Sequence, residues 1–224
     1  MKAKEKQNQI VFDDYDINKF VFGPQSSYTI NHDPKLLIFM WSRYKFVSKM
    51  MSGKDKILEI GCGDGFGMPI ILQTVNYVMG CDIEPLLLND NISRNKKLNC
   101  DFSVCDITKD SPKIINKKYD AIFLEEALAP AMAVCVDAYF TNIVKVIKKN
   151  GFFIIGTPNI YASEYASPIS KQGHINLHSH ESLKKKMEEY FINCFSFSMN
   201  DEIVHTGFEK MAHYIFILGV GIKK

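Results

Sequence analysis

The stretch that decides the fold of this 224-residue chain is Lys-Ile-Leu-Glu-Ile-Gly-Cys-Gly-Asp-Gly-Phe-Gly, at positions 56–67. An apolar run broken only by Glu59 leads into glycine at every second position, and the apolar segment 68–72 follows. This order predicts a strand, a tight turn and a helix. Glycine allows positive φ and the close approach of a ligand. A turn of this kind therefore predicts a nucleotide site in a doubly wound α/β fold.

The spacing of the glycines narrows the choice of nucleotide. The dinucleotide fingerprint Gly-x-Gly-x-x-Gly needs a glycine three positions after its second one, and that position here is Phe66. A phosphate-binding P-loop ends in Gly-Lys-Ser or Gly-Lys-Thr, and this stretch has no such ending. Phe66 thus disfavours a nicotinamide-dependent enzyme, an alternative that NAD binding would reveal.

Residues 57–67, with an acid inside the strand and then alternate glycines, resemble motif I of the class I S-adenosylmethionine-dependent methyltransferases. The likeness extends over residues 33–224. It implies a Rossmann-like, doubly wound α/β fold with a mostly parallel seven-stranded sheet, an antiparallel terminal strand and an N-terminal helical segment. It also implies S-adenosylmethionine as cofactor and S-adenosylhomocysteine as product.

Composition fits an ordinary globular protein, with 46% hydrophobic and 23% charged residues and a net charge of +2. Arg43 and Arg94 are the only arginines, and lysine reads bases and phosphates poorly. We therefore expect a small-molecule partner, with nucleic acid unfavoured and no membrane partner, while the oligomeric state stays open. The six cysteines form no Cys-x-x-Cys pair, so we expect reduced, buried thiols, no metal site and a cytoplasmic protein without a signal peptide.

Strands and helices alternate after residue 54, which predicts a parallel sheet with helices on both faces. We expect a helix that opens at Asp33-Pro34, and turn chemistry with scattered aromatic residues in the preceding 11–32. The predicted strands are 57–60, 77–82, 102–105, 119–124, 152–156, 195–199 and 213–221, and the later helices are 85–97, 137–149 and 181–191. One domain would span 1–224, with a cap (1–53), an α/β core (54–224) and a substrate-loop insertion at about 157–180.

The acid that follows the second strand is Asp82, nineteen residues after Gly63. At that place a carboxylate can accept both ribose hydroxyls, although Asp82 also suits a helix cap. The resemblance implies that Asp106 bonds the adenine amino group, although a loop aspartate is also a common turn residue. It further places Ile83, Cys105 and Ile107 against the adenine. The motif itself supplies Glu59, Gly61, Cys62 and Gly63 to the expected cofactor site.

Related enzymes cover the cofactor with an N-terminal segment, which implies roles for Tyr28 and Arg43. A guanidinium suits the cofactor's carboxylate, whereas the neighbouring Tyr44 falls on the apolar helix stripe and is expected in the core. After the fourth strand, Glu125 is the expected cofactor contact. Where similar members read Leu-Glu-His, this chain reads Leu-Ala-Pro at 128–130. That departure favours an alternative in which the protein binds the cofactor without catalysis.

His174, in the insertion, is the first candidate for a general base because the pKa of a free imidazole lies near neutral pH. A structural hydrogen bond is an equally open interpretation. His205, in a polar loop before the last strand, is the second candidate, while His178 and His180 are weaker ones.

These features predict methyl transfer to an oxygen, or a nitrogen, of a small polar metabolite. The segments 156–159 (Gly-Thr-Pro-Asn) and 173–176 (Gly-His-Ile-Asn) resemble those of sugar and quinone-type methyltransferases. Sugars or other precursors of a bacterial surface polysaccharide are therefore the first acceptors to consider. A protein or RNA methyltransferase remains the alternative, which a concentrated basic face would favour.

Overall fold

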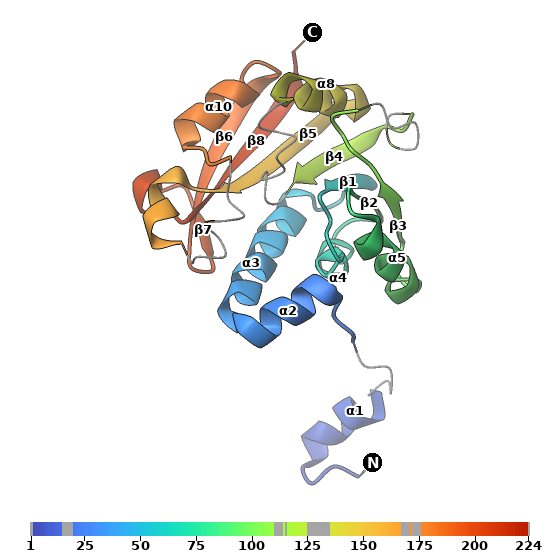
Figure 1. Ribbon diagram of the computed structural model, residues 1–224. Helices are drawn as coiled ribbons and strands as arrows, with labels where there is room; N and C mark the ends of the chain where they lie inside the picture. Colours follow the sequence, from blue (N-terminus) through green and yellow to red (C-terminus); the bar gives the residue numbers. More distant parts are fainter. Residues whose placement is uncertain are drawn as a thin grey trace.

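The computed structural model describes residues 2–14, 20–109, 114, 116–124, 135–166, 171 and 176–223. Across them runs an eight-stranded sheet in the order β3-β2-β1-β4-β5-β8-β6-β7 (Figure 1). The strands are β1 (Lys56–Ile60), β2 (Tyr77–Asp82), β3 (Cys100–Val104), β4 (Tyr119–Leu124), β5 (Ile147–Pro158), β6 (Phe191–Asn200), β7 (Ile203–His205) and β8 (Tyr214–Ile222).

Helices cover both faces of this sheet (Figure 1). The α-helices are α1 (Lys6–Asp14), α2 (Pro24–His32), α3 (Pro34–Met50), α4 (Met68–Ile71), α5 (Pro85–Arg94), α8 (Val136–Val146) and α10 (His180–Met187), and the 3₁₀ turns are η1 (Ile160–Tyr165) and η2 (Glu209–Met211). Asp33 accepts a hydrogen bond from the Leu36 N–H and so caps α3. In the described part of the chain, no helix combines the length and apolar character needed to cross a bilayer.

The strands β3, β2, β1, β4 and β5 are parallel, and β8 pairs antiparallel with both β5 and β6. The chain moves outward from β1 through β2 to β3, then returns to place β4 on the other side of β1. The carboxyl ends of β1 and β4 therefore flank a topological switch point, the place where an open α/β sheet binds its ligand.

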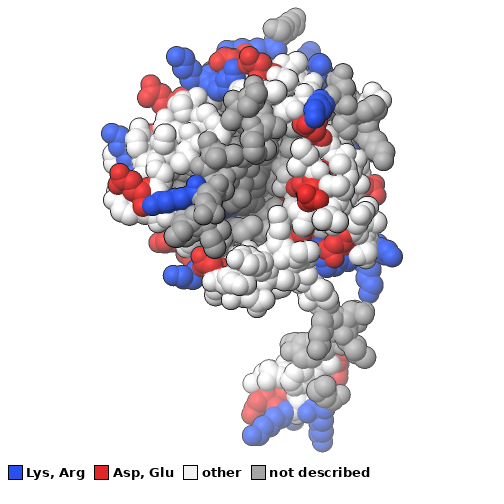
Figure 2. All heavy atoms as spheres, viewed as in Figure 1, with Lys and Arg blue, Asp and Glu red and all other residues white. Residues whose placement is uncertain are grey.

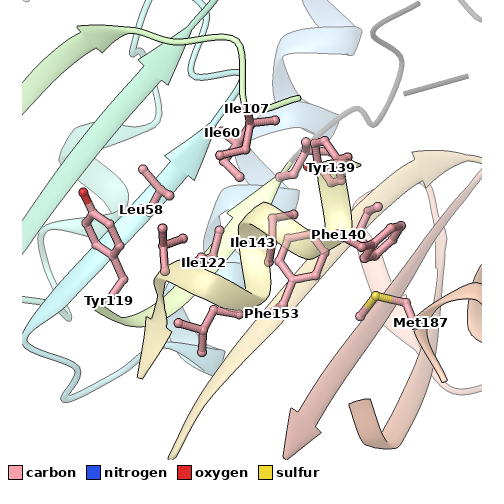
Figure 3. Close-up of a cluster of buried hydrophobic side chains, with 14 of the residues drawn as sticks. Leu58, Ile60, Ile107, Tyr119, Ile122, Tyr139, Phe140, Ile143, Phe153 and Met187 are labelled. Carbon is pink, nitrogen blue, oxygen red and sulfur yellow. The ribbon is translucent and has the colours of Figure 1, made fainter. Parts of the chain in front are cut away.

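Alternate side chains of the central strands enter two cores. Leu58 and Ile60 face α8 and α10, in the cluster that contains Phe140, Ile143 and Phe153 (Figure 3). Ile57, one residue earlier, belongs to the opposite cluster, which α3, α4 and α5 cover. Because both faces are buried, the central strands are almost continuously apolar.

The predicted doubly wound fold is confirmed, with differences in several elements. The helix expected at 181–191 ends at Met187, β6 already begins at Phe191, and the helix expected at 85–97 ends at Arg94. The sheet has eight strands rather than seven, because part of the polar loop after β6 folds back as β7 and pairs with Ser198–Asn200. Residues 24–32, expected as turns, form α2, with Pro24 in its first turn where a missing N–H costs nothing. Helix α8 also ends at Val146, since Ile147 already pairs with Tyr119 as the start of β5.

We expect Phe153→Ala to lower the free energy of unfolding by about 3–5 kcal/mol, because it empties a fully buried site. The Phe153 ring lies 6.1 Å from that of Phe140 and 6.2 Å from that of Phe191, centroid to centroid. Urea unfolding measures the change. Phe195→Ala is the matched control, because Phe195 is 53% exposed and its loss should cost far less. Equal losses from the two variants would contradict this description of the core.

Candidate functional site

Two glycines of the turn after β1 adopt positive φ angles. Gly61 has φ +73° and Gly63 has φ +51°, a region that side chains strongly disfavour. The Gly61 and Cys62 N–H groups both donate to the Cys81 carbonyl of β2, at 2.8 and 3.0 Å. A Cβ placed at Gly61 would meet no atom within 4 Å, so the turn presents bare backbone to open space.

Asp82, the last residue of β2, is bonded directly to this turn. Its Oδ2 accepts from the Gly63 N–H at 2.9 Å, and its Oδ1 accepts from the Glu84 N–H at 2.9 Å. An ionised carboxylate offers about four lone-pair positions, so both oxygens keep acceptor capacity. The side chain is fixed in orientation and remains able to accept two further hydroxyl groups.

Helix α5 fixes the other side of the turn. Asn91 donates from Nδ2 to the Gly63 carbonyl at 2.7 Å, and Arg94 donates to the Asp64 carbonyl at 2.6 Å. Arg94 is itself oriented by an ion pair with Asp90 at 2.6 Å. One of the two arginines of the chain thus shapes the turn rather than facing a ligand.

A cavity of about 220 Å³ lies over the glycine turn. It is lined by Gln25, Ser26, Met40, Tyr44, Gly61, Cys62, Gly63, Asp64, Phe66 and Asp82. Three parts of the chain that are far apart in sequence therefore meet here, namely α2 with α3, the glycine turn, and the end of β2.

Glu59, the second-last residue of β1, lies next to residues that line this cavity and is 1% exposed. Its Oε1 accepts a hydrogen bond of 2.5 Å from the Tyr44 hydroxyl, while its Oε2 has no partner among the described residues. Burial raises the pKa of the Glu59 carboxyl to about 8, and the Tyr44 bond only partly opposes that shift. The nearby Asp82 and Asp64 raise the pKa further.

The contact between Ser26 and Asp64 attaches α2 to the glycine turn. Both the N–H and the hydroxyl of Ser26 donate to Asp64 Oδ2, each at 2.7 Å, and both residues are buried. The second oxygen, Oδ1, has no partner among the described residues. A Cβ at Gly63 would collide with the Gln25 side chain, so α2 lies directly over the turn.

The residues expected around the adenine lie next to the end of β2. Ile83 is 61% exposed, whereas Cys105 and Ile107 are buried against the core. Asp106 lies between the two buried residues and accepts from the Thr108 hydroxyl at 2.6 Å. That bond is the main reason why the pKa of Asp106 is lowered.

The two N-terminal candidates lie in different surroundings. Arg43 is buried, with its guanidinium 4.0 Å from the centre of the Tyr214 ring. Tyr28 is 54% exposed and stacks on His32, with ring centres 4.0 Å apart. Neither is among the residues that line the cavity.

His205 is the last residue of β7 and bonds to near neighbours in the sequence. Its Nδ1 accepts from the Gly207 N–H at 2.9 Å, so its Nε2 carries the proton toward Asn200 Oδ1 at 2.7 Å. His180 contacts the Phe197 carbonyl and pairs with Glu209, and His178 contacts Ser182. Burial lowers the pKa of His178. His174, Glu125 and residues 128–130, to which the sequence analysis gave roles, lie outside the described residues.

Sequence reasoning missed six of the residues that line this cavity: Gln25, Ser26, Met40, Tyr44, Asp64 and Phe66. Tyr44 is in the core as expected, but its hydroxyl also binds Glu59. Asp64 lies inside the glycine run. A charged residue in a turn that the fold is expected to bury needs a partner, and this was the signal that could have identified Asp64. All six cysteines are free thiols, and the described residues contain no group of His, Cys, Asp and Glu arranged for a metal ion.

A family model described as "Methyltransferase domain" matches residues 52–211. This range includes the glycine turn, Glu59, Asp82 and most of the sheet. No protein of curated function matches the chain.

Solved structures resemble the fold at low sequence identity. The N-methyltransferase NodS from Bradyrhizobium japonicum, in complex with S-adenosyl-L-homocysteine, has a TM-score of 0.63 and 15% identity, over 87% of this chain and 91% of that one. The methyltransferase domain of bacterial CtHen1 has a TM-score of 0.67 and 14% identity, over 82% of this chain and 99% of that one. A complex of the Haloferax volcanii Trm112 methyltransferase activator with a putative methyltransferase reaches 0.66 at 14% identity, over 89% and 96%.

We expect Ser26→Ala to loosen α2, because it removes a 2.7 Å hydrogen bond to a buried carboxylate. A bond to a charged group is worth about 1.5–3 kcal/mol, so amide hydrogen exchange in 24–32 should accelerate by roughly one to two orders of magnitude. Ser27→Ala is the control, since the Ser27 hydroxyl makes only a 3.4 Å contact with the Phe22 carbonyl. Equal acceleration in both variants would rule out the Ser26–Asp64 contact as the anchor.

A pH-dependent loss of stability should follow from Glu59. Its pKa is about 8 in the folded protein against 4.5 as the ordinary value, so its contribution is fully present below pH 4.5 and is lost as the pH rises through 8. Each pKa unit corresponds to about 1.4 kcal/mol, so the loss should reach a few kcal/mol. Urea unfolding of the wild type and Glu59→Gln at pH 5, 7 and 9 measures it.

The variant should lack this part of the pH dependence and gain stability relative to the wild type at pH 9. Glu202→Gln, at an exposed position, serves as the control and should follow the wild type. Parallel curves for the wild type and Glu59→Gln would show that Glu59 does not carry the effect.

Proposed function

This chain belongs to the methyltransferase-domain family, as an S-adenosylmethionine-dependent methyltransferase, and we propose that it methylates an oxygen, or a nitrogen, of a small polar metabolite. The observation that carries the cofactor site is the cavity over the glycine turn, with Asp82 bonded to the Gly63 N–H at its edge. We further propose that residues 1–224 act as one unit, with 157–180 as the segment beside the acceptor.

The residues present fit this cofactor. At Gly61 the backbone faces open space that a Cβ would fill. Two buried carboxyl oxygens near the cavity, Glu59 Oε2 and Asp64 Oδ1, have no hydrogen-bond partner among the described residues. Three carboxyl groups around one cavity favour a ligand with positive charge. S-adenosylmethionine carries an ammonium group and a sulfonium group.

In the proposed complex, Asp82 accepts the ribose hydroxyls and Asp106 the adenine amino group. Ile83, Cys105 and Ile107 flank the adenine, and the exposure of Ile83 suits that role. The glycine-turn backbone, with Cys62, supports the nucleoside.

We propose that the amino-acid end of the cofactor lies next to Glu59, Arg43, Tyr28 and Glu125. Arg43 would pair with its carboxylate.

When bound, S-adenosylmethionine supplies a methyl group already activated by a positive sulfur for direct displacement. The protein then has to align the acceptor and exclude water. A base beside the acceptor hydroxyl contributes about 10²–10⁴-fold in such reactions. We propose His174 for this role, with His205 as second candidate.

The distribution of charge supports a small acceptor over a nucleic acid. On the face shown in Figure 2, Lys and Arg are interspersed with Asp and Glu and do not gather into one basic field. Binding to a polyanion depends on such a field.

Transfer of labelled methyl from S-adenosylmethionine to sugars and other small acceptors tests the proposal. Labelling of only protein or RNA would replace it with the macromolecular alternative, and labelling of nothing would favour binding without catalysis.

We expect wild-type protein to bind S-adenosylmethionine and S-adenosylhomocysteine in calorimetry, with no binding of NAD. Asp82→Ala should weaken both ligands by roughly 10–100-fold or more. It removes the two hydrogen bonds that hold the turn as well as the acceptor for ribose.

Asp101→Asn is the matched control. Asp101 lies on the adjacent strand β3, is exposed, and bonds Tyr77 instead of the turn. Unchanged affinity in Asp82→Ala would remove Asp82 from the site, and no binding by the wild type would overturn the cofactor assignment.

A further inference from the structure

Glu59 is a buried acid for which the described residues provide no cation. Its carboxyl is fully enclosed and receives one hydrogen bond from these residues, donated by Tyr44. None of the ion pairs among the described residues includes Glu59. An ionised carboxylate without a cation is costly in such a place, so the group keeps its proton.

The titratable groups that act on Glu59 come from several elements. Tyr44 approaches from α3, Asp64 from the glycine turn and Asp82 from the end of β2. The Cys62 thiol, also buried, is close enough for its own pKa to be raised by Glu59. The Cys100 thiol of β3 also lies close enough for Glu59 to raise its pKa. The influences on Glu59 are therefore one hydroxyl donor and two further acids, and both acids oppose its ionisation.

The cavity connects this buried acid to a ligand. Tyr44, Asp64 and Asp82 all line the cavity, and each also interacts with Glu59. A positive charge placed in the cavity would therefore contact side chains that act directly on the Glu59 carboxyl. An opposite charge within about 4–6 Å lowers the pKa of a carboxyl by about 1–3 units.

We propose that Glu59 releases its proton when a cationic ligand fills this cavity, so that cofactor binding is coupled to proton release. The proposal rests on the function proposed above, which supplies S-adenosylmethionine as that ligand. The O–H bond of the Glu59 carboxyl breaks, its electron pair stays on the carboxylate, and the proton passes to water and then to buffer. Glu59 thereby becomes the counter-charge of the ligand only while the ligand is bound.

The direction of the pH dependence follows from the folded protein. With a pKa of about 8, most free protein holds the proton at pH 7. Binding that lowers this pKa by 1–3 units releases about half a proton to one proton at pH 7. Affinity should therefore increase as the pH rises from 6 to 8 and level off above 8.

Calorimetry of the full chain at pH 7, in phosphate, HEPES and Tris buffers, tests this coupling. The buffers differ in ionisation enthalpy, so the slope of the observed binding enthalpy against it gives the number of protons released. S-adenosylmethionine should release the most, S-adenosylhomocysteine less because it lacks the sulfonium charge, and adenosine none because it lacks both cationic groups.

Two variants identify the group that titrates. Glu59→Gln keeps an acceptor for Tyr44 but cannot ionise, so it should bind S-adenosylmethionine without proton release and with little change in affinity between pH 6 and 8. Asp82→Asn removes a different acid of the cavity and should weaken binding while proton release persists. Comparison of ligands on the wild type alone keeps the test decisive if either variant folds poorly.

The outcomes separate the two proposals. No binding of any of the three ligands would overturn the cofactor site itself. Tight binding of S-adenosylmethionine with no proton release, or with equal release by wild type and Glu59→Gln, would overturn the role of Glu59 and leave the cofactor site intact.

Discussion

The glycine turn after β1 is the constraint on which the rest of the site depends. Gly61 and Gly63 adopt positive φ, and this brings their backbone under the cavity while their N–H groups point to β2 and Asp82. Further along, a Cβ at Gly67 would overlap the Tyr44 ring. The absence of side chains therefore has two effects: it opens a surface for a ligand, and it lets α3 pack closely enough for Tyr44 to reach Glu59.

Much of the fold could be predicted from sequence because its signals are local. Apolar strands that end in glycine or acid, and Asp33-Pro34 before a helix, specify their own conformation without knowledge of partners. The misses depend on tertiary contacts. Helix α2 has little apolar periodicity and is held by Ser26 on Asp64, 38 residues away. Strand β7 is three residues long and exists through its pairing with β6.

The same distinction applies to the site. The spacing from Gly63 predicted that Asp82 lies beside the glycine turn, where it could accept ribose hydroxyls. In the structure Asp82 does lie there and accepts the Gly63 N–H at 2.9 Å, because adjacent parallel strands bring their carboxyl ends together. The bond from Tyr44 to Glu59 could not be predicted, since a tyrosine on an apolar stripe looks the same whether or not its hydroxyl has a partner. Charge burial, which decides the pKa of Glu59, is likewise a property of the packed structure.

The buried acids also show that the kind of ligand this cavity suits depends on local charge more than on the net charge of the chain. The chain carries only +2 overall, yet Glu59, Asp64 and Asp82 converge on one cavity. Ser26 donates twice to Asp64 Oδ2, and two backbone N–H groups donate to Asp82. Glu59 receives one hydrogen bond from the described residues, and its burial costs stability as the pH rises above 4.5. Polar groups that oppose stability in this way are typical of binding sites, and the partner that Glu59 lacks within the described chain is a cation.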